Sequence, residues 1–126
     1  MSNLSVKISP SVLTADFLTL KDDIKKLEAA GTDMLHLDVM DGIFVPNISF
    51  GVPVIKSIKK HTSLPLDVHL MIDRPHRYIK QFAEAADSGL SLRGGQRCAC
   101  DSYRDKGARL QGLSYNKAGH CARGDI

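Results

Sequence analysis

The sequence predicts an α/β fold in which short strands alternate with helices. Three observations support this prediction. Apolar residues alternate in short segments, they recur at three- and four-residue spacing in longer segments, and the short segments begin roughly 30 residues apart, as parallel βαβ units do. With 126 residues, of which 43% are hydrophobic and 25% charged, the chain has the size and composition of one domain.

The first unit is predicted to consist of a strand at residues 6–8 and the helix that follows it. Asp16 has the side chain of a helix N-cap, and Gly31 lies where the helix should end, because glycine tolerates a positive φ. Four apolar residues between them recur on one helical face: Phe17, Leu20, Ile24 and Leu27.

The second unit begins with a strand predicted at residues 34–39. Its alternation places three apolar side chains on one face and His36 and Asp38 on the other. A loop rich in Asp, Gly, Pro and Asn follows, and a helix is predicted over residues 53–61. Its apolar face consists of Val54, Ile55 and Ile58.

The third unit begins with a strand predicted at residues 66–70, which again holds a histidine, His69, between apolar neighbours. Asp73 and Pro75 have the positions of residues that open a helix. Its apolar positions are Tyr78, Ile79 and Phe82.

Ligands of α/β folds bind at the carboxyl ends of parallel strands. The ends predicted here hold Ser11, His36, Asp38, Met40, Asp41, His69 and Met71. Two imidazoles and a carboxylate from neighbouring strands favour a site for a divalent transition metal, with zinc as the first candidate. The structural alternative is that the polar groups are satisfied within the core, that the methionines fill it, and that Asp41 shapes a loop.

Four long segments resemble the ribulose-phosphate 3-epimerase family. They are residues 9–17 (SPSVLTADF), 36–47 (HLDVMDGIFVPN), 50–54 (FGVPV) and 67–72 (DVHLMI), within a similarity over residues 6–87. The resemblance implies an eight-stranded (β/α) barrel, of which the chain would hold the first three units. It also implies an isomerase of the pentose phosphate pathway that interconverts ribulose 5-phosphate and xylulose 5-phosphate.

The resemblance further implies roles for single residues. Asp38 is expected to accept the C3 proton and, with His36 and His69, to hold one divalent metal ion; zinc comes first, then manganese, iron or cobalt. This metal would stabilise the enediolate electrostatically. The residues expected to contact the substrate are Ser11, His36, Met40, His69 and Met71. Ser11 would hydrogen-bond near the reacting oxygens, and the two methionines would pack against the planar enediolate.

The family's reaction needs a second acid on the opposite face of the enediolate. The strand that would supply it is missing here, as are the glycine-rich phosphate loops, and such a barrel has about 250 residues. We therefore expect a truncated epimerase that is inactive alone. The alternatives are a fragment that regains activity with another copy or a complementary chain, a related epimerase acting on allulose 6-phosphate, and a non-catalytic remnant that binds a metal or a sugar phosphate.

The composition changes near residue 87. Residues 1–87 contain 10 Lys and Arg and 11 Asp and Glu, whereas residues 88–126 contain 7 and 3, and no Val, Phe or Met. We expect an epimerase-like domain over residues 1–87 and a poorly ordered tail over residues 88–126, too poor in branched aliphatic residues for barrel strands. One hypothesis is that the tail is translated out of frame, because residues 106–125 read one base later are compatible with the family's next helix and strand.

Other features bear on partners and location. No apolar run approaches the roughly 18 residues of a membrane span, and residues 1–10 lack the pattern of a secretory signal, which predicts a cytoplasmic protein. The basic tail lacks interleaved aromatic residues, which argues against nucleic acid as a partner. The spacing of Cys98, Cys100, His120 and Cys121 disfavours a zinc site. The expected partner is a small phosphosugar, and a homo-oligomer is a further expectation.

Overall fold

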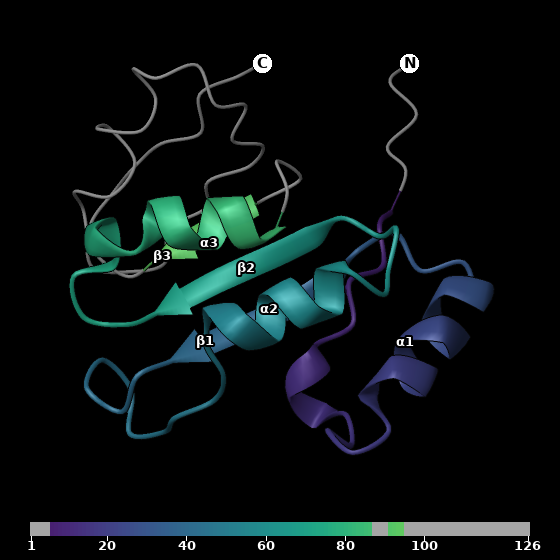
Figure 1. The fold of residues 1–126 in the computed structure, drawn as a ribbon, viewed down its shortest axis with the longest axis horizontal. Helices are drawn as coiled ribbons and strands as arrows, with labels where there is room; N and C mark the ends of the chain where they lie inside the picture. The colour runs from purple at the N-terminus through teal and green to yellow at the C-terminus, as the bar shows by residue number, and fades with distance from the viewer. Residues whose placement is uncertain (1–5, 87–90, 95–126) are drawn as a thin grey trace.

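Three parallel strands form the centre of the fold (Figure 1). In the computed structural model, which describes residues 6–86 and 91–94, they lie side by side in chain order as β1 (Leu35–Met40), β2 (Leu66–Met71) and β3 (Ser91–Gly94). The α-helices are α1 (Leu20–Ala29), α2 (Val52–Lys59) and α3 (Ile79–Ala86), and short 3-10 helices occur at η1 (Val12–Thr14) and η2 (Pro75–Arg77). The predicted alternation of parallel strands and helices is confirmed.

One face of β1 and β2 builds the hydrophobic core. Six strand residues on it are at most 4% exposed: Leu35, Leu37, Val39, Leu66, Val68 and Leu70. They join four buried residues from α2 and α3: Ile55, Ile58, Ile79 and Phe82. Burial of each large side chain stabilises the fold by about 1.5–3 kcal/mol. Packing on this face therefore supplies most of the free energy that holds the strands against the helices.

The segment before β1 differs from the prediction. Residues 6–8 belong to no strand, and Ile8 is 61% exposed. The chain nevertheless runs beside β1, because the His36 amide donates to the Pro10 carbonyl (2.9 Å) and Ser11 pairs with His36 in an isolated parallel bridge. Pro10 has no amide hydrogen, so it interrupts the ladder of backbone hydrogen bonds between this segment and β1. The pairing that remains still places Ser11 next to β1.

Helix α1 begins at Leu20, later than a cap at Asp16 would place it. The Asp16 carboxylate instead accepts a hydrogen bond from the Leu18 amide (2.9 Å), which stabilises a local turn before the helix. Phe17 therefore lies outside α1 and packs edge-on against Phe50, with ring centroids 5.9 Å apart. The predicted start of this helix was wrong because a side chain competed with the helical backbone.

The end of α1 follows the prediction, since Gly31 has a φ of 82° just after the helix. Helix α2 covers most of the predicted span 53–61. The helix predicted to open at Pro75 is divided into η2 and α3, and Tyr78 between them is 39% exposed rather than part of the apolar face.

Strand β3 lies in the part of the chain that was predicted to lack strands. Its four residues pair in parallel with β2, although Leu92 is its only branched aliphatic residue. Backbone pairing with a strand that has already formed does not depend on the side-chain pattern, which explains why the pattern missed it. The rest of the predicted tail, including its cysteines and the hypothesis of a shifted reading frame, lies outside the described residues.

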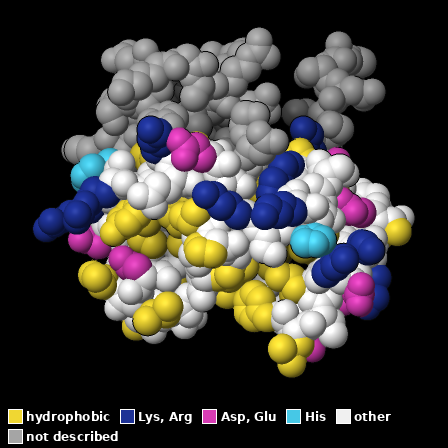
Figure 2. All heavy atoms as spheres, viewed as in Figure 1, with side chains coloured by type: hydrophobic (Ala, Val, Ile, Leu, Met, Phe, Trp, Pro, Cys, Tyr) yellow, Lys and Arg dark blue, Asp and Glu magenta, His cyan; other side chains and the backbone are white. Residues whose placement is uncertain are grey.

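Hydrophobic side chains also gather at the surface between α1 and α2 (Figure 2). They line a cleft of about 600 Å³, whose walls include Phe17, Leu20, Phe50, Pro53 and Val54. Among the described residues, no helix has the length and hydropathy that a membrane span requires.

Candidate metal centre

The polar face of β1 and β2 carries the candidate site. His36 and Asp38 alternate with buried residues of β1, so their side chains lie on the face opposite the core. The parallel register places Asp38 opposite His69 and His36 opposite Asp67. A shift of one residue would turn these polar side chains into the core, so burial of the apolar face also fixes the register of the site.

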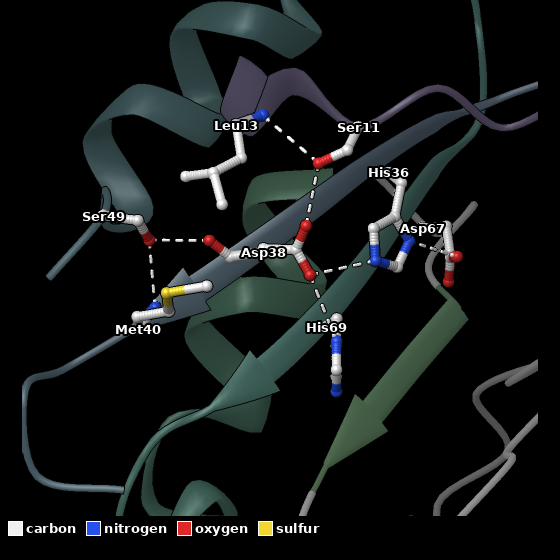
Figure 3. Close-up of polar contacts among 8 residues, drawn as sticks. All are labelled: Ser11, Leu13, His36, Asp38, Met40, Ser49, Asp67 and His69. Atoms are coloured by element: carbon white, nitrogen blue, oxygen red, sulfur yellow. Dashed lines mark hydrogen bonds and ion pairs between the residues drawn. The ribbon is translucent and has the colours of Figure 1, made fainter. Parts of the chain in front are cut away.

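Asp38 lies at the centre of the site (Figure 3). Its Oδ1 atom is 3.0 Å from His36 Nε2 and 3.2 Å from His69 Nδ1. Its Oδ2 atom accepts a hydrogen bond from the Ser11 hydroxyl at 2.8 Å. The Leu13 amide in turn donates to Ser11 Oγ (3.3 Å), so the capping of η1 also orients the serine. The structure thus brings together Ser11, His36, Asp38 and His69.

The surroundings of Asp38 lower its pKa. Burial of the carboxyl group acts in the opposite direction, because it disfavours the charged form. The hydrogen bond from Ser11 and the contacts with His36 and His69 outweigh burial, so the pKa falls below the ordinary value of 3.8. Asp38 is therefore ionised at neutral pH and has the charge that a metal ligand or a general base requires.

Within the described residues, one group of His, Cys, Asp and Glu side chains could hold a metal ion, and it consists of His36, Asp38 and His69. Their ligand atoms all lie within 4.8 Å of one another, and each residue is partly exposed. Two imidazole nitrogens and one carboxylate oxygen are the donors that catalytic zinc sites use, with a further position left open. The donor set therefore fits a divalent transition metal without specifying which one.

Met40 and Met71 form the last pair of the register between β1 and β2. By alternation, Met40 shares a face with Asp38, and Met71 shares a face with His69. Both methionines are partly buried, at the carboxyl ends of the strands where the sequence predicted them. Their contact with a substrate stays a prediction.

Sequence reasoning overlooked Asp67 as a member of the site. Its side chain is only 3% exposed, and its Oδ2 atom lies 2.8 Å from His36 Nδ1. The alternation of β2 contained the signal, since Asp67 and His69 are two residues apart and share a face. Each nitrogen of His36 thus faces a carboxylate, Asp38 on one side and Asp67 on the other.

Ser49 is a second residue that the sequence did not single out. Its hydroxyl donates to the Asp38 carbonyl (2.6 Å) and accepts a hydrogen bond from the Met40 amide (3.0 Å). The loop after β1 is thereby attached to the end of the strand. No sequence pattern marks this serine, because its partners are backbone groups.

Asp41 organises both loops at this edge of the sheet. Its Oδ1 atom accepts hydrogen bonds from the Ile43 and Phe44 amides (2.9 and 3.0 Å), and its Oδ2 atom accepts one from the Asp73 amide (2.7 Å). These hydrogen bonds lower the pKa of Asp41, that from Asp73 most of all, and keep its carboxylate charged. Asp41 therefore shapes the two loops, as the structural alternative predicted.

Comparison with known proteins identifies the family. The sequence profile of the Ribulose-phosphate 3 epimerase family matches residues 7–99, which include β3. The ribulose-phosphate 3-epimerase of Bacillus subtilis (strain 168) is 51% identical over 87 residues, which are 69% of this chain and 40% of that protein. The cytoplasmic isoform of ribulose-phosphate 3-epimerase from Oryza sativa subsp. japonica is 45% identical over 88 residues, which are 70% of this chain and 39% of that protein.

The chloroplastic ribulose-5-phosphate-3-epimerase of Arabidopsis thaliana is 41% identical over 103 residues, which are 82% of this chain and 37% of that protein. The chain thus spans about 40% of the length of the curated relatives it matches. The profile match and these identities agree with the arrangement of the site on consecutive parallel strands. The chain belongs to the ribulose-phosphate 3-epimerase family.

Proposed function

We propose that this chain carries the metal-binding and proton-abstracting part of a ribulose-phosphate 3-epimerase active site. The observation that supports this most directly is the position of Asp38, an ionised carboxylate that Ser11 holds between two imidazoles. The substrate we propose is ribulose 5-phosphate, in keeping with the names of the relatives. Its C3 hydrogen is adjacent to the C2 carbonyl, so removal of that proton gives an enediolate.

His36, Asp38 and His69 would hold a divalent cation, and we propose zinc first because two imidazoles and a carboxylate suit it. When bound, the cation would stabilise the negative charge of the enediolate. The partial exposure of the three side chains leaves room for a small molecule beside them.

Asp38 is the proposed acceptor of the C3 proton. The C3–H bond breaks, its electron pair forms the C2–C3 double bond, the C2 oxygen becomes negative, and the proton moves to the Asp38 carboxylate. A carboxylate with a lowered pKa is a weak base toward a carbon acid, so this step requires stabilisation of the enediolate. Ser11 would keep the carboxylate oriented, and Met40 and Met71 would shield the planar enediolate from water.

Inversion at C3 needs a second acid on the other face of the enediolate. In the metal-ligand group that residues 6–86 form, Asp38 is the single carboxylate. We therefore propose that the chain alone exchanges the C3 hydrogen with solvent through Asp38 and returns it to the same face. The acid for inversion would have to come from outside the described residues, whether from the rest of this chain, from a second copy or from a complementary chain.

The test is hydrogen exchange in heavy water. The full chain is incubated with ribulose 5-phosphate and zinc or manganese, and NMR follows two signals, loss of the C3 hydrogen and formation of xylulose 5-phosphate. We expect deuterium at C3 without inversion, at a rate that falls to background in Asp38→Asn. Asp16→Asn is the matched control, because Asp16 also accepts a hydrogen bond but lies outside the site.

Two results would change the proposal. Inversion by the purified chain would show that this chain or its oligomer supplies the second acid, and light scattering would distinguish the monomer from an oligomer. Metal binding with no exchange, or exchange that Asp38→Asn leaves unchanged, would contradict the proposed role of Asp38 and favour a non-catalytic binding protein.

A further inference from the structure

We propose that Asp67 is a positioning residue that fixes the tautomer of His36. By accepting the proton of Nδ1, Asp67 would leave the lone pair of Nε2 free to bind a cation. The role of Asp67 in fixing the tautomer concerns the metal-free protein and stands by itself. The role of that tautomer in cation binding deepens the proposed function and rests on it.

The geometry of His36 carries the argument. Its ring lies between two carboxylates, with Nδ1 2.8 Å from Asp67 Oδ2 and Nε2 3.0 Å from Asp38 Oδ1 (Figure 3). The register holds this arrangement, because Asp67 lies opposite His36 in the parallel pairing of β1 and β2. The contact between Asp67 and His36 is therefore fixed by backbone pairing as well as by the rotamers of the two side chains.

A neutral imidazole has a single N–H, and two carboxylates compete for it. If the proton sits on Nε2, it points at Asp38, and the nitrogen that faces the metal-ligand group has no lone pair to offer. If it sits on Nδ1, it points at Asp67, and Nε2 is a ligand. The function of His36 therefore depends on which carboxylate attracts the proton more strongly.

Two observations favour Asp67 in this competition. Its contact with the ring is the shorter of the two, and its side chain is 3% exposed, against 15% for Asp38. A hydrogen bond to a carboxylate is stronger where water is excluded. A carboxylate behind a metal-binding histidine is a common way to fix its tautomer and orientation.

His69 provides an internal comparison. Among the described residues, its side chain hydrogen-bonds with Asp38, whose Oδ1 atom is 3.2 Å from Nδ1, and the His69 side chain is 34% exposed. It has no contact with Asp67 of the kind that His36 makes. A change at Asp67 should therefore alter the tautomer of His36 much more than that of His69.

The first experiment reads the tautomers by nitrogen-15 NMR of the imidazole rings. It uses the full metal-free chain, at a pH raised until the ring signals no longer move. We expect His36 to be protonated at Nδ1 in the unmodified chain. In Asp67→Asn, which keeps the shape of the side chain and removes its charge, we expect the proton to shift largely to Nε2, with His69 unchanged.

Val68→Ala is the matched structural control. Val68 is a fully buried neighbour on β2, and its side chain lies on the opposite face of the sheet. This variant should lower stability and leave the His36 tautomer as it was. If Val68→Ala shifted the tautomer as much as Asp67→Asn, the effect would be structural and the proposal would be wrong. A proton on Nε2 of the unmodified chain would overturn it without any variant.

The second experiment titrates Co²⁺ alone into each protein and follows its visible absorption. Loss of a group that orients a metal ligand weakens affinity by about 10–100-fold, and we expect Asp67→Asn to fall in this range. Unchanged cobalt affinity in a variant whose tautomer has shifted would overturn the link between Asp67 and metal binding. If the unmodified chain bound no cobalt, the proposed function would fail, whereas the tautomer experiment would still decide the role of Asp67.

Discussion

The two faces of β1 and β2 are held in place by different forces. On the apolar face, Leu37 and Val68 are completely buried in the core. On the polar face, His36, Asp38 and His69 remain partly exposed and are positioned by hydrogen bonds. The side chains of the two faces alternate along the same backbone, so a single register serves both.

Because the two faces are held by different interactions, substitutions on one face should affect stability and substitutions on the other should affect the site. A change on the apolar face should act through the free energy of unfolding, because it removes buried surface. A change on the polar face should act on metal binding and proton transfer, with a smaller effect on folding.

Leu37→Ala should lower the free energy of unfolding by about 2–5 kcal/mol, since Leu37 is fully buried and the truncated side chain would leave a cavity. Urea unfolding followed by circular dichroism measures the change. Leu18→Ala is the control, because Leu18 is 95% exposed and its loss should cost less than about 0.5 kcal/mol. Equal effects of the two variants would show that the described core is not the one that forms in solution.

Asp38→Asn should weaken cobalt binding by about 100-fold or more, because even a group behind a metal ligand is worth about 10–100-fold. Its fold should be retained, as judged by an unchanged circular dichroism spectrum. The comparison of the two faces fails if this variant unfolds the protein or leaves the cobalt affinity unchanged. Asp16→Asn again serves as the control for a carboxylate outside the site.

Ser49→Ala should lower the free energy of unfolding by about 1 kcal/mol, because it removes one hydroxyl that bonds both the Asp38 carbonyl and the Met40 amide. The cobalt affinity should change little, since no ligand atom is lost. Ser57→Ala, at an exposed position on α2, should leave urea unfolding unchanged. A large loss of cobalt affinity in Ser49→Ala would show that the loop after β1 takes part in metal binding.

The smallest effect that we expect is a dependence of stability on acid pH. The folded pKa of Asp38 is lowered, so its contribution is complete above the unfolded pKa of about 3.9 and is lost as the pH falls through the folded pKa. Urea midpoints measured at decreasing acid pH should therefore fall less steeply in Asp38→Asn. Part of the slope should remain, because Asp41 also has a lowered pKa. An identical slope in both proteins would contradict the proposed surroundings of Asp38.

Much of the polar face could be predicted from the sequence, because alternation is a local property. His36 and Asp38 are two residues apart, and this spacing alone puts them on one face of a strand. The register between strands is not local, so the pairing of His36 with Asp67 and of Asp38 with His69 had to come from the structure. Alternation alone places Asp67 on the same face as His69, but only the register shows that Asp67 lies opposite His36.

The mistaken elements have local physical causes. Pro10 prevents a ladder where the pattern of residues 6–8 predicted a strand, and the Asp16 side chain forms a turn where a helix cap was predicted. In β3, backbone pairing with β2 succeeds without the apolar alternation that sequence reasoning looks for. Competing interactions of single groups, rather than the average pattern, decided these positions.

The order of the strands has a consequence for synthesis on the ribosome. Their order across the sheet is their order along the chain, so each strand can pair with the one made just before it. Ser11, His36, Asp38 and His69 are therefore all in place once β2 has joined β1. At about 5–20 residues per second, the stretch from the first to the last of these residues takes seconds to translate. The side chains proposed to bind a cation would thus be assembled before translation of the later segments is finished.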